Sequence, residues 1–255
     1  MAIIALRGWY IEKYEPIREL RKRPHDIRLS KNSLLKSGLR ADFLEESAEI
    51  EQTEWFNRYL AGERVEFYID GSGGYAISNI DLSSHEIYFT KHDVLAHLEP
   101  KIFLSRQSAY PQASEQLQER LEQFLTDFNR RSRVPLTLEL SQRPLEGAIR
   151  LSAHQLRQIR KSLLVVADTT PLAATGGDEA QLLPSPNVCI ELGYALQSKP
   201  VEHILLARQN RRDLSGRFPF DLPTYQQLEF SDEAGLERAL PTVMETMLQR
   251  FRLVS

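Results

Sequence analysis

The stretch SLLVVADTT at residues 162–170 decides the fold, together with SPNVCIELGYA at residues 185–195. The first stretch contains five consecutive apolar residues, 163–167, and ends at Asp168. An uninterrupted apolar run of this length, followed by a polar loop, is typical of a central parallel strand that is covered on both faces. The second stretch predicts a helix at residues 187–197. A strand, a loop and a helix in this order are the repeating unit of α/β proteins.

The same alternation extends from residue 99 to residue 255. Five apolar runs predict strands at residues 101–105, 134–140, 163–167, 202–207 and 225–230. Helical spacing predicts four helices, at residues 112–131, 151–161, 187–197 and about 232–251, with Ser231 as a candidate N-cap of the last. Right-handed crossovers leave few topologies for such a chain. We expect a five-stranded, doubly wound parallel sheet with the flavodoxin-like strand order 2-1-3-4-5.

Residues 1–98 have a different pattern and predict a smaller α+β domain. Short helices are expected at residues 14–20, 33–44 and 48–59, and strands at residues 65–69, 75–80 and 86–90. The glycine-rich residues 71–74 lie between two of these strands and lack the Gly-Lys-Ser/Thr that completes a phosphate-binding loop. They therefore predict the turn of a β-hairpin.

Charge is distributed unevenly in this first domain, although the whole chain has a formal charge of only −3. Residues 1–40 have a net charge of +6, and residues 41–54 have a net charge of −6. The two segments could neutralise each other across one surface. Alternatively, the basic segment could bind an anionic or protein partner.

Composition excludes several classes of protein. The single cysteine, Cys189, excludes an intrachain disulfide framework and a multi-cysteine zinc site. The six histidines lack metal-ligand spacing, so we expect neither a metal nor a cofactor. No apolar run approaches the roughly 20 residues that span a bilayer. The sequence therefore predicts a cytoplasmic protein without a membrane span.

The predicted strand order also predicts where a ligand would bind. In open parallel sheets, ligands occupy the crevice beyond the carboxyl ends of the strands, where the order reverses. Residues 105–111 and 168–186 form the loops at that place. Asp168 lies at the rim of this crevice, and Glu191 lies in the first two turns of the following helix.

Three residues after the first strand, Ser105, Arg106 and Gln107, are candidates to bind phosphate or ribose hydroxyls. A guanidinium such as that of Arg106 suits an anionic nucleotide because it can form bidentate hydrogen bonds.

The helix at residues 187–197 contributes further candidates. Asn187 is expected to cap the helix, with substrate contact as a second role. We expect Gly193 to allow close packing of the helix on the sheet and Cys189 to be buried. Tyr194 could belong either to the core or to the pocket wall. The insertion at residues 171–184 could be a lid over the pocket or a decoration that blocks catalysis.

The sequences LLVVADTT (163–170) and SPNVCIELGYAL (185–196) resemble the "ADLT…NPNVxYELGYA" signature of a superfamily. Its members are nucleoside 2-deoxyribosyltransferase-like and TIR-like nucleotide-binding domains. KIFLS (101–105) resembles their first strand, and RFPFDLPTYQQLEF (217–230) resembles their "PFDL" segment. The resemblance covers about residues 99–255 and leaves the first 98 residues unexplained.

The resemblance implies a flavodoxin-like, TIR-like fold that binds NAD, a nucleotide or a nucleoside derivative. It implies that Glu191 is the nucleophile, or stabilises the positive charge that develops on the sugar when an N-glycosidic bond breaks. Asp168 would handle the substrate or a proton. Because TIR-like domains often act as assemblies, a homo-oligomer is also implied.

Three hypotheses stay open at this point. The first is an enzyme, either an NAD glycohydrolase or a nucleoside deoxyribosyltransferase-like N-glycosidase. The second is a non-catalytic nucleotide-sensing or signalling module that acts through protein–protein interaction. The third is an interaction protein that works through the basic N-terminal segment.

Overall fold

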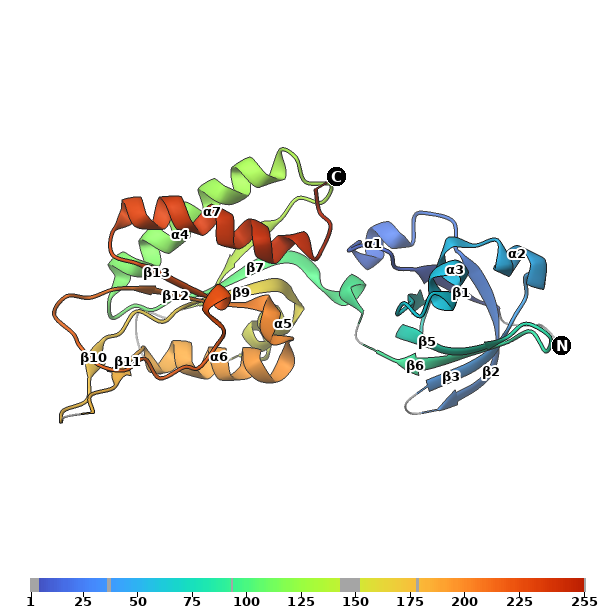
Figure 1. The fold of residues 1–255 in the computed structure, drawn as a ribbon, viewed down its shortest axis with the longest axis horizontal. Helices are drawn as coiled ribbons and strands as arrows, with labels where there is room; N and C mark the ends of the chain where they lie inside the picture. Colours follow the sequence, from blue (N-terminus) through green and yellow to red (C-terminus); the bar gives the residue numbers. More distant parts are fainter. Residues whose placement is uncertain (1–4, 36–37, 93, 143–151, 178, 255) are drawn as a thin grey trace. The chain divides into compact units, whose positions relative to one another are not determined.

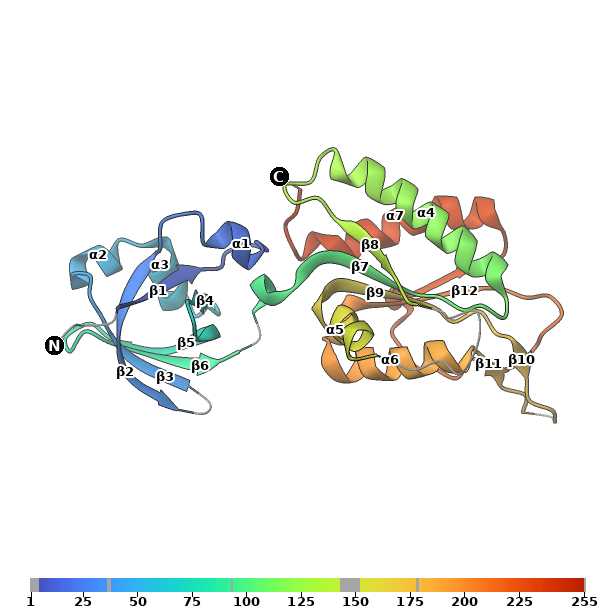
Figure 2. The same ribbon diagram turned by 180° about the vertical axis from the view of Figure 1, so that it is seen from behind.

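The structure is a computed structural model that describes residues 5–35, 38–92, 94–142, 152–177 and 179–254. The chain divides into two compact units, Met1–Leu98 and Glu99–Ser255. Figures 1 and 2 show that the first unit is a barrel and that the second is a sheet with helices on both faces.

The first unit is a closed antiparallel barrel with the strand order β1-β2-β3-β6-β5-β4. Closure pairs every strand on both sides, so the barrel has no free edge. Aromatic side chains fill its interior, where Trp55 packs edge-on against Phe67 with ring centroids 5.2 Å apart. Its strands are β1 (Ala5–Tyr10), β2 (Ile27–Leu35), β3 (Gly38–Phe43), β4 (Glu66–Ile69), β5 (Gly73–Asp81) and β6 (Glu86–Lys91). Its helices are α1 (Ile17–Leu20), α2 (Ser47–Glu51), α3 (Glu54–Leu60) and the 3₁₀ helix η1 (Leu95–His97).

The helix predicted at residues 33–44 is wrong, because 33–35 form the end of β2 and 38–43 form β3. Residues 36–37 lie outside the described residues. Buried and accessible residues alternate along β3, with Leu39, Ala41 and Phe43 buried and Arg40 exposed. This period of two belongs to a strand. Pairing of β3 with both β2 and β6 selects the strand over the helix.

The other short helices are only partly as predicted. The helix expected at residues 14–20 is reduced to the four residues of α1. The helix expected at residues 48–59 is divided into α2 and α3, because the hydroxyl of Thr53 caps α3 by accepting a hydrogen bond from the amide of Phe56 at 3.3 Å. The β4–β5 hairpin and strand β6 confirm the strands predicted there.

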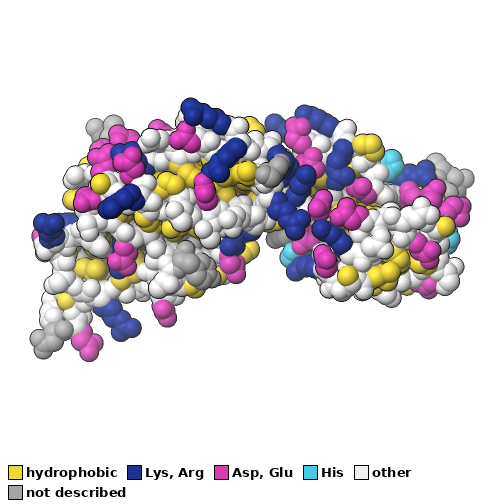
Figure 3. Space-filling view, turned by 45° about the horizontal axis from the view of Figure 1, so that its top comes forward, with side chains coloured by type: hydrophobic (Ala, Val, Ile, Leu, Met, Phe, Trp, Pro, Cys, Tyr) yellow, Lys and Arg dark blue, Asp and Glu magenta, His cyan; other side chains and the backbone are white. Residues whose placement is uncertain are grey.

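Basic side chains of the first 40 residues form ion pairs within the barrel unit. Asp70 accepts hydrogen bonds from both Arg7 and Arg21, at 2.8 and 2.6 Å. Arg28 pairs with Glu45 at 3.0 Å, which joins the basic segment to the acidic one. Lys36 lies outside the described residues. On the face drawn in Figure 3, basic and acidic side chains of this unit are intermixed. This pairing weakens the field that the segment presents to an anionic partner.

The second unit contains a parallel sheet with the order β13-β12-β9-β7-β8. When the five strands of this sheet are numbered in chain order and the sheet is read from β8 to β13, the order is 2-1-3-4-5, as predicted. Strand β9 is buried along its whole length, as expected for the central strand. The strands are β7 (Glu99–Ser105), β8 (Thr137–Leu140), β9 (Ser162–Asp168), β12 (Ile204–Gln209) and β13 (Gln227–Phe230).

Two pairs of helices cover the two faces of this sheet (Figures 1 and 2). Helices α4 (Pro111–Asn129) and α7 (Glu233–Gln249) lie on one face, and α5 (Ala153–Lys161) and α6 (Pro186–Ser198) lie on the other. The predicted start of α5 at residue 151 lies outside the described residues. The N-cap expected at Ser231 is wrong: Asp232 caps α7 by accepting from the amide of Gly235 at 2.8 Å. Two 3₁₀ helices, η2 (Val201–His203) and η3 (Thr224–Gln226), precede β12 and β13.

The insertion at residues 171–184 forms a two-stranded hairpin of β10 (Ala173–Ala174) and β11 (Leu182–Leu183). It is fastened to the long connection between β12 and β13. The amide of Leu182 donates to the carbonyl of Arg217 at 2.9 Å, and the amide of Arg217 donates to the carbonyl of Ala180 at 2.8 Å. Gly216 permits this contact, because a Cβ there would lie 2.7 Å from the Ala180 carbonyl oxygen. The β10–β11 hairpin and the β12–β13 connection are therefore held together by backbone hydrogen bonds beside the sheet.

The expectation that Gly193 allows close packing on the sheet is wrong. Gly193 is exposed, and a Cβ placed on it would meet no atom within 4 Å outside its own helix. Helix α6 contacts the sheet instead through Val188, Leu192 and Ala195. Cys189 is only half-buried, so it is not the core residue that was expected.

We predict that Gly193→Ala stabilises the protein by about 1 kcal/mol, because alanine is favoured over glycine inside helices by that amount and finds free space here. Urea unfolding of the variant and the parent measures the difference. A destabilised variant would mean that Gly193 packs closely against another part of the molecule.

Candidate functional site

Polar side chains gather where three neighbouring parallel strands end. Ser105 ends β7, Asp168 ends β9 and Gln209 ends β12, and all three are buried. The register places Ser105 beside Ala167 and Asp168 beside Ala207. The strands therefore end side by side, at the edge of the sheet where the sequence predicts a ligand.

Strand alternation divides these groups between the two faces of the sheet. Phe103 and Ala167 pack into the core beneath α6, so Ser105, two residues beyond Phe103, lies on the α6 face. Asp168 follows Ala167 and lies on the opposite face, where it contacts Ser114 of α4. The two predicted catalytic carboxylates consequently share one edge but lie on different faces.

On the α6 face, Glu191 is only 1% exposed and is held by two donors. The hydroxyl of Ser105 donates to Oε2, and the side-chain amide of Gln155 in α5 donates to Oε1. One carboxylate thus joins a strand end to two helices. Its orientation is fixed before any ligand binds.

On the α4 face, Asp168 accepts hydrogen bonds from three residues. Its Oδ2 accepts from the Ser114 hydroxyl at 2.5 Å and from Gln107 Nε2 at 3.2 Å. Its Oδ1 accepts from the amide of Thr170 at 3.0 Å. Burial raises the pKa of the Asp168 carboxyl, and these donors only partly oppose the rise. A carboxyl of this kind suits proton transfer or a hydrogen bond to a polar ligand.

The other predicted site residues are Arg106, Asn187 and Tyr194, and the structure contradicts the role expected of Asn187. Arg106 is anchored to the end of β8, because its amide donates to Ser141 Oγ at 2.9 Å and its Nε donates to the Ser141 carbonyl at 3.2 Å. Asn187 does not cap α6: Ser185 occupies the N-cap position without a capping side-chain bond, and Asn187 is the second helical residue. Tyr194 packs against the core cluster, which is one of its two expected environments.

Several residues of the edge were missed from the sequence. Thr170 and Gln209 had a usable signal, because each lies at or just beyond the end of a predicted strand. Ser114 and Gln155 had none, because only tertiary packing brings these helical residues to the carboxylates.

Arg211 was also missed, although it joins three loops at this edge. Its guanidinium lies 4.8 Å from the ring centroid of Tyr110, which precedes α4. Its Nη1 donates to the carbonyl of Pro171, beyond β9, at 3.2 Å. Asp213 pairs with the same guanidinium. Arg211 therefore places a cation beside the ends of β7, β9 and β12.

Other kinds of site were also considered among the described residues. They contain no group of three or more His, Cys, Asp or Glu side chains that could hold a metal ion. None of their helices is long and apolar enough to cross a membrane. Burial raises the pKa of the Cys189 thiol, which does not favour a reactive thiolate.

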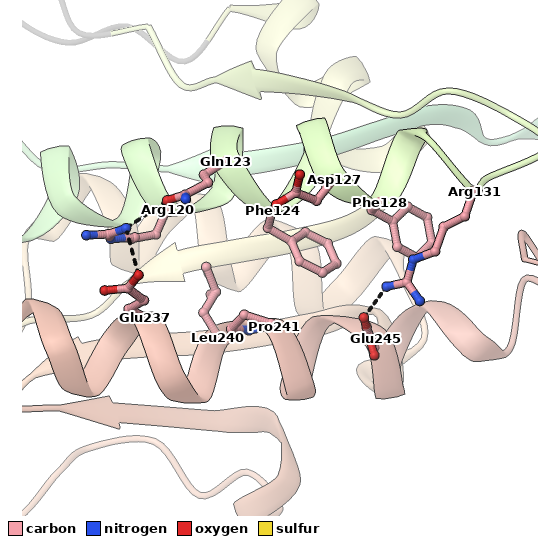
Figure 4. Close-up of a pocket in the computed structure, with 10 residues that line it drawn as sticks. All are labelled: Arg120, Gln123, Phe124, Asp127, Phe128, Arg131, Glu237, Leu240, Pro241 and Glu245. Carbon is pink, nitrogen blue, oxygen red and sulfur yellow. Dashed lines mark hydrogen bonds and ion pairs between the residues drawn. The ribbon is translucent and has the colours of Figure 1, made fainter.

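A groove of about 270 Å³ lies between α4 and α7, along the helices rather than at the strand ends (Figure 4). Phe124, Phe128 and Leu240 form its apolar part. Two ion pairs cross the groove, Arg120 with Glu237 and Arg131 with Glu245. It lacks the buried, convergent carboxylates of the strand ends, so the candidate site remains at the sheet edge.

No family model matches the chain, and no curated protein sequence matches it. The assignment of the site therefore depends on its own geometry and on the sequence resemblance.

Asp168→Asn should become more stable relative to the parent as the pH rises from about 4 to 7. Because the folded-state pKa of Asp168 is raised, its stabilising contribution is complete below the unfolded pKa of about 3.9 and is lost as the pH rises through the folded value. Asparagine does not titrate and avoids that loss. Urea unfolding at several pH values measures the slope.

Asp213→Asn is the matched control. Arg211 lowers the pKa of Asp213, so its slope should be flat or of the opposite sign. A relative stability of Asp168→Asn that falls with rising pH would contradict the raised pKa.

Proposed function

We propose that the Glu99–Ser255 unit is a flavodoxin-like, TIR-like domain that binds a nucleotide at the carboxyl edge of its sheet. The best supported ligand class is NAD or a nucleoside derivative. In this proposal, Glu191 acts on the N-glycosidic bond and Asp168 contacts the substrate from the other face.

The burial of two carboxylates at the point where the strand order reverses carries the proposal. Asp and Glu are almost never fully buried unless they are paired. Here both are buried next to the ends of β7 and β9, and each is held by hydroxyl and amide donors. This point is the usual ligand position in open parallel sheets.

The chemistry proposed for Glu191 is the breaking of the bond between C1′ of the sugar and the base nitrogen. The base leaves with the electron pair of that bond, and positive charge develops on the sugar ring. A fixed carboxylate stabilises this charge, and a water molecule then adds to C1′ and loses a proton. The proton goes to solvent when the base leaves as a neutral molecule, as nicotinamide does, or to the released nitrogen when a nucleoside base leaves with a negative charge. Substrate contact with Glu191 would replace one of the hydrogen bonds from Ser105 and Gln155.

A non-catalytic nucleotide-sensing module is the second candidate, and one observation favours it. Glu191 is almost inaccessible, and both its oxygens already accept hydrogen bonds from protein donors. In such a module Glu191 would fasten α6 to β7 and α5. Ligand binding would then change the packing of these elements without turnover.

Incubation with NAD and a panel of nucleosides, followed by chromatography of the released base, tests the enzymatic proposal. We expect release by the parent and at least a 100-fold loss in Glu191→Gln, since an acting carboxylate contributes about 10²–10⁴-fold. Glu202→Gln, which changes an exposed glutamate just after α6, should keep full activity.

The same ligands tested by thermal unfolding separate the two candidates. Ligand-dependent stabilisation without base release would support the non-catalytic module. Neither release nor stabilisation by any member of the panel would contradict the proposed function as a whole.

A further inference from the structure

Two buried glutamine oxygens on the α4 face make no hydrogen bond to any residue that the structure describes. They are Oε1 of Gln107, whose residue is 3% exposed, and Oε1 of Gln209, whose residue is 9% exposed. Buried polar atoms nearly always have a partner, and each unmet group costs about 1–3 kcal/mol. Two such acceptors at one end of the sheet therefore require an explanation.

The orientation of the Gln107 amide is fixed by its neighbours. Its Nε2 donates to Asp168 Oδ2 at 3.2 Å and to the Thr170 carbonyl at 3.0 Å, and both of these atoms are acceptors. Exchanging the nitrogen and the oxygen would bring acceptor against acceptor. Oε1 must therefore be the atom without a protein partner.

Gln209 belongs to the same face and the same neighbourhood. It lies two residues beyond Ala207, the register partner of Asp168, so its side chain is on the Asp168 side of the sheet. The backbone amide of Gln209 donates to the Thr170 hydroxyl at 2.9 Å. Thr170 thus contacts the side chain of Gln107 and the backbone of Gln209.

The available atoms define the ligand group that could bind here. The free atom of Gln107 is a neutral amide oxygen, which accepts but cannot donate. The Gln209 amide makes no hydrogen bond to the described residues, so it can also turn its oxygen toward a donor. The Asp168 carboxyl lies beside the Gln107 amide, because Gln107 Nε2 donates to its Oδ2 at 3.2 Å. An ionised phosphate or carboxylate offers only acceptors to an amide oxygen, whereas a neutral group with N–H donors can satisfy it.

We propose that Gln107 and Gln209 recognise the N–H donors of a primary amide or amino group on the base of the nucleotide. This inference rests on the proposed nucleotide site and assigns the base to the α4 face. It makes the two glutamines specificity-determining residues. Phosphates would then lie elsewhere along the edge, where Arg106 and Arg211 provide cationic groups.

Two ligand pairs that each differ in a single group test the assignment. Nicotinamide mononucleotide is compared with nicotinic acid mononucleotide, and adenosine monophosphate is compared with inosine monophosphate. Isothermal titration calorimetry with the full chain measures each affinity. In any pair that binds, we expect at least tenfold tighter binding of the member that has the primary amide or the exocyclic amino group, because a site built to bond such a group rejects its analogue.

Gln209→Met is the principal variant, because the Gln209 side chain makes no hydrogen bond to the described residues that the substitution would remove. It should reduce the ratio of affinities within the pair about tenfold. Gln107→Met should do the same but also loses the bonds to Asp168 and Thr170, so its fold is checked by circular dichroism. Gln197→Met, at an exposed position of α6, is the control and should keep the parental ratio.

The outcomes separate this inference from the proposed function. Equal binding of the two members of a pair by the parent, or an unchanged ratio in Gln209→Met, would overturn only the role of the glutamines. Failure of the parent to bind any of the four nucleotides would overturn the proposed function and this inference together.

Discussion

Strand β9 is buried on both faces from Ser162 to Asp168, and this burial determines where the polar groups of the site can lie. Removing each Val or Leu side chain from water contributes about 1.5–3 kcal/mol. The strand therefore stays in the middle of the sheet, and its first charged residue is forced to the edge. The neighbouring strands β7 and β12 end beside β9, so Ser105 and Gln209 also lie at the carboxyl end of the sheet.

Alternation along the strands then separates this edge into two clusters. Ser105 faces α6 and receives Glu191, while Asp168 and Gln209 face α4. In the α6 cluster the carboxylate is satisfied by protein donors. In the α4 cluster two acceptors have no hydrogen-bond partner among the described residues. Under the proposed function, the first cluster supplies a carboxylate of fixed orientation and the second receives a donor from the ligand. This division fits a ligand whose sugar and base contact different faces.

The sequence predicted most of the second unit because its signals are local. The apolar run of β9, the spacing of α4 and the alternation of strands and helices led to the strand order and to Asp168 and Glu191. Closure of the barrel could not be predicted, because Gly38–Phe43 form strand β3 only by pairing with β2 and β6. For the same reason Gln155 and Ser114 were missed. The expected roles of Asn187 and Gly193 failed because a short motif does not say which face of α6 is covered.

Amide hydrogen exchange in the presence of saturating NAD tests most directly whether the carboxyl edge is the ligand site. The account predicts slower exchange in residues 105–111, 168–172 and 209–211, which form the ends of β7, β9 and β12 and their loops. Residues 120–131 and 237–245, which line the α4–α7 groove, should be unchanged. Protection confined to that groove, or no protection at the three strand ends, would contradict the account.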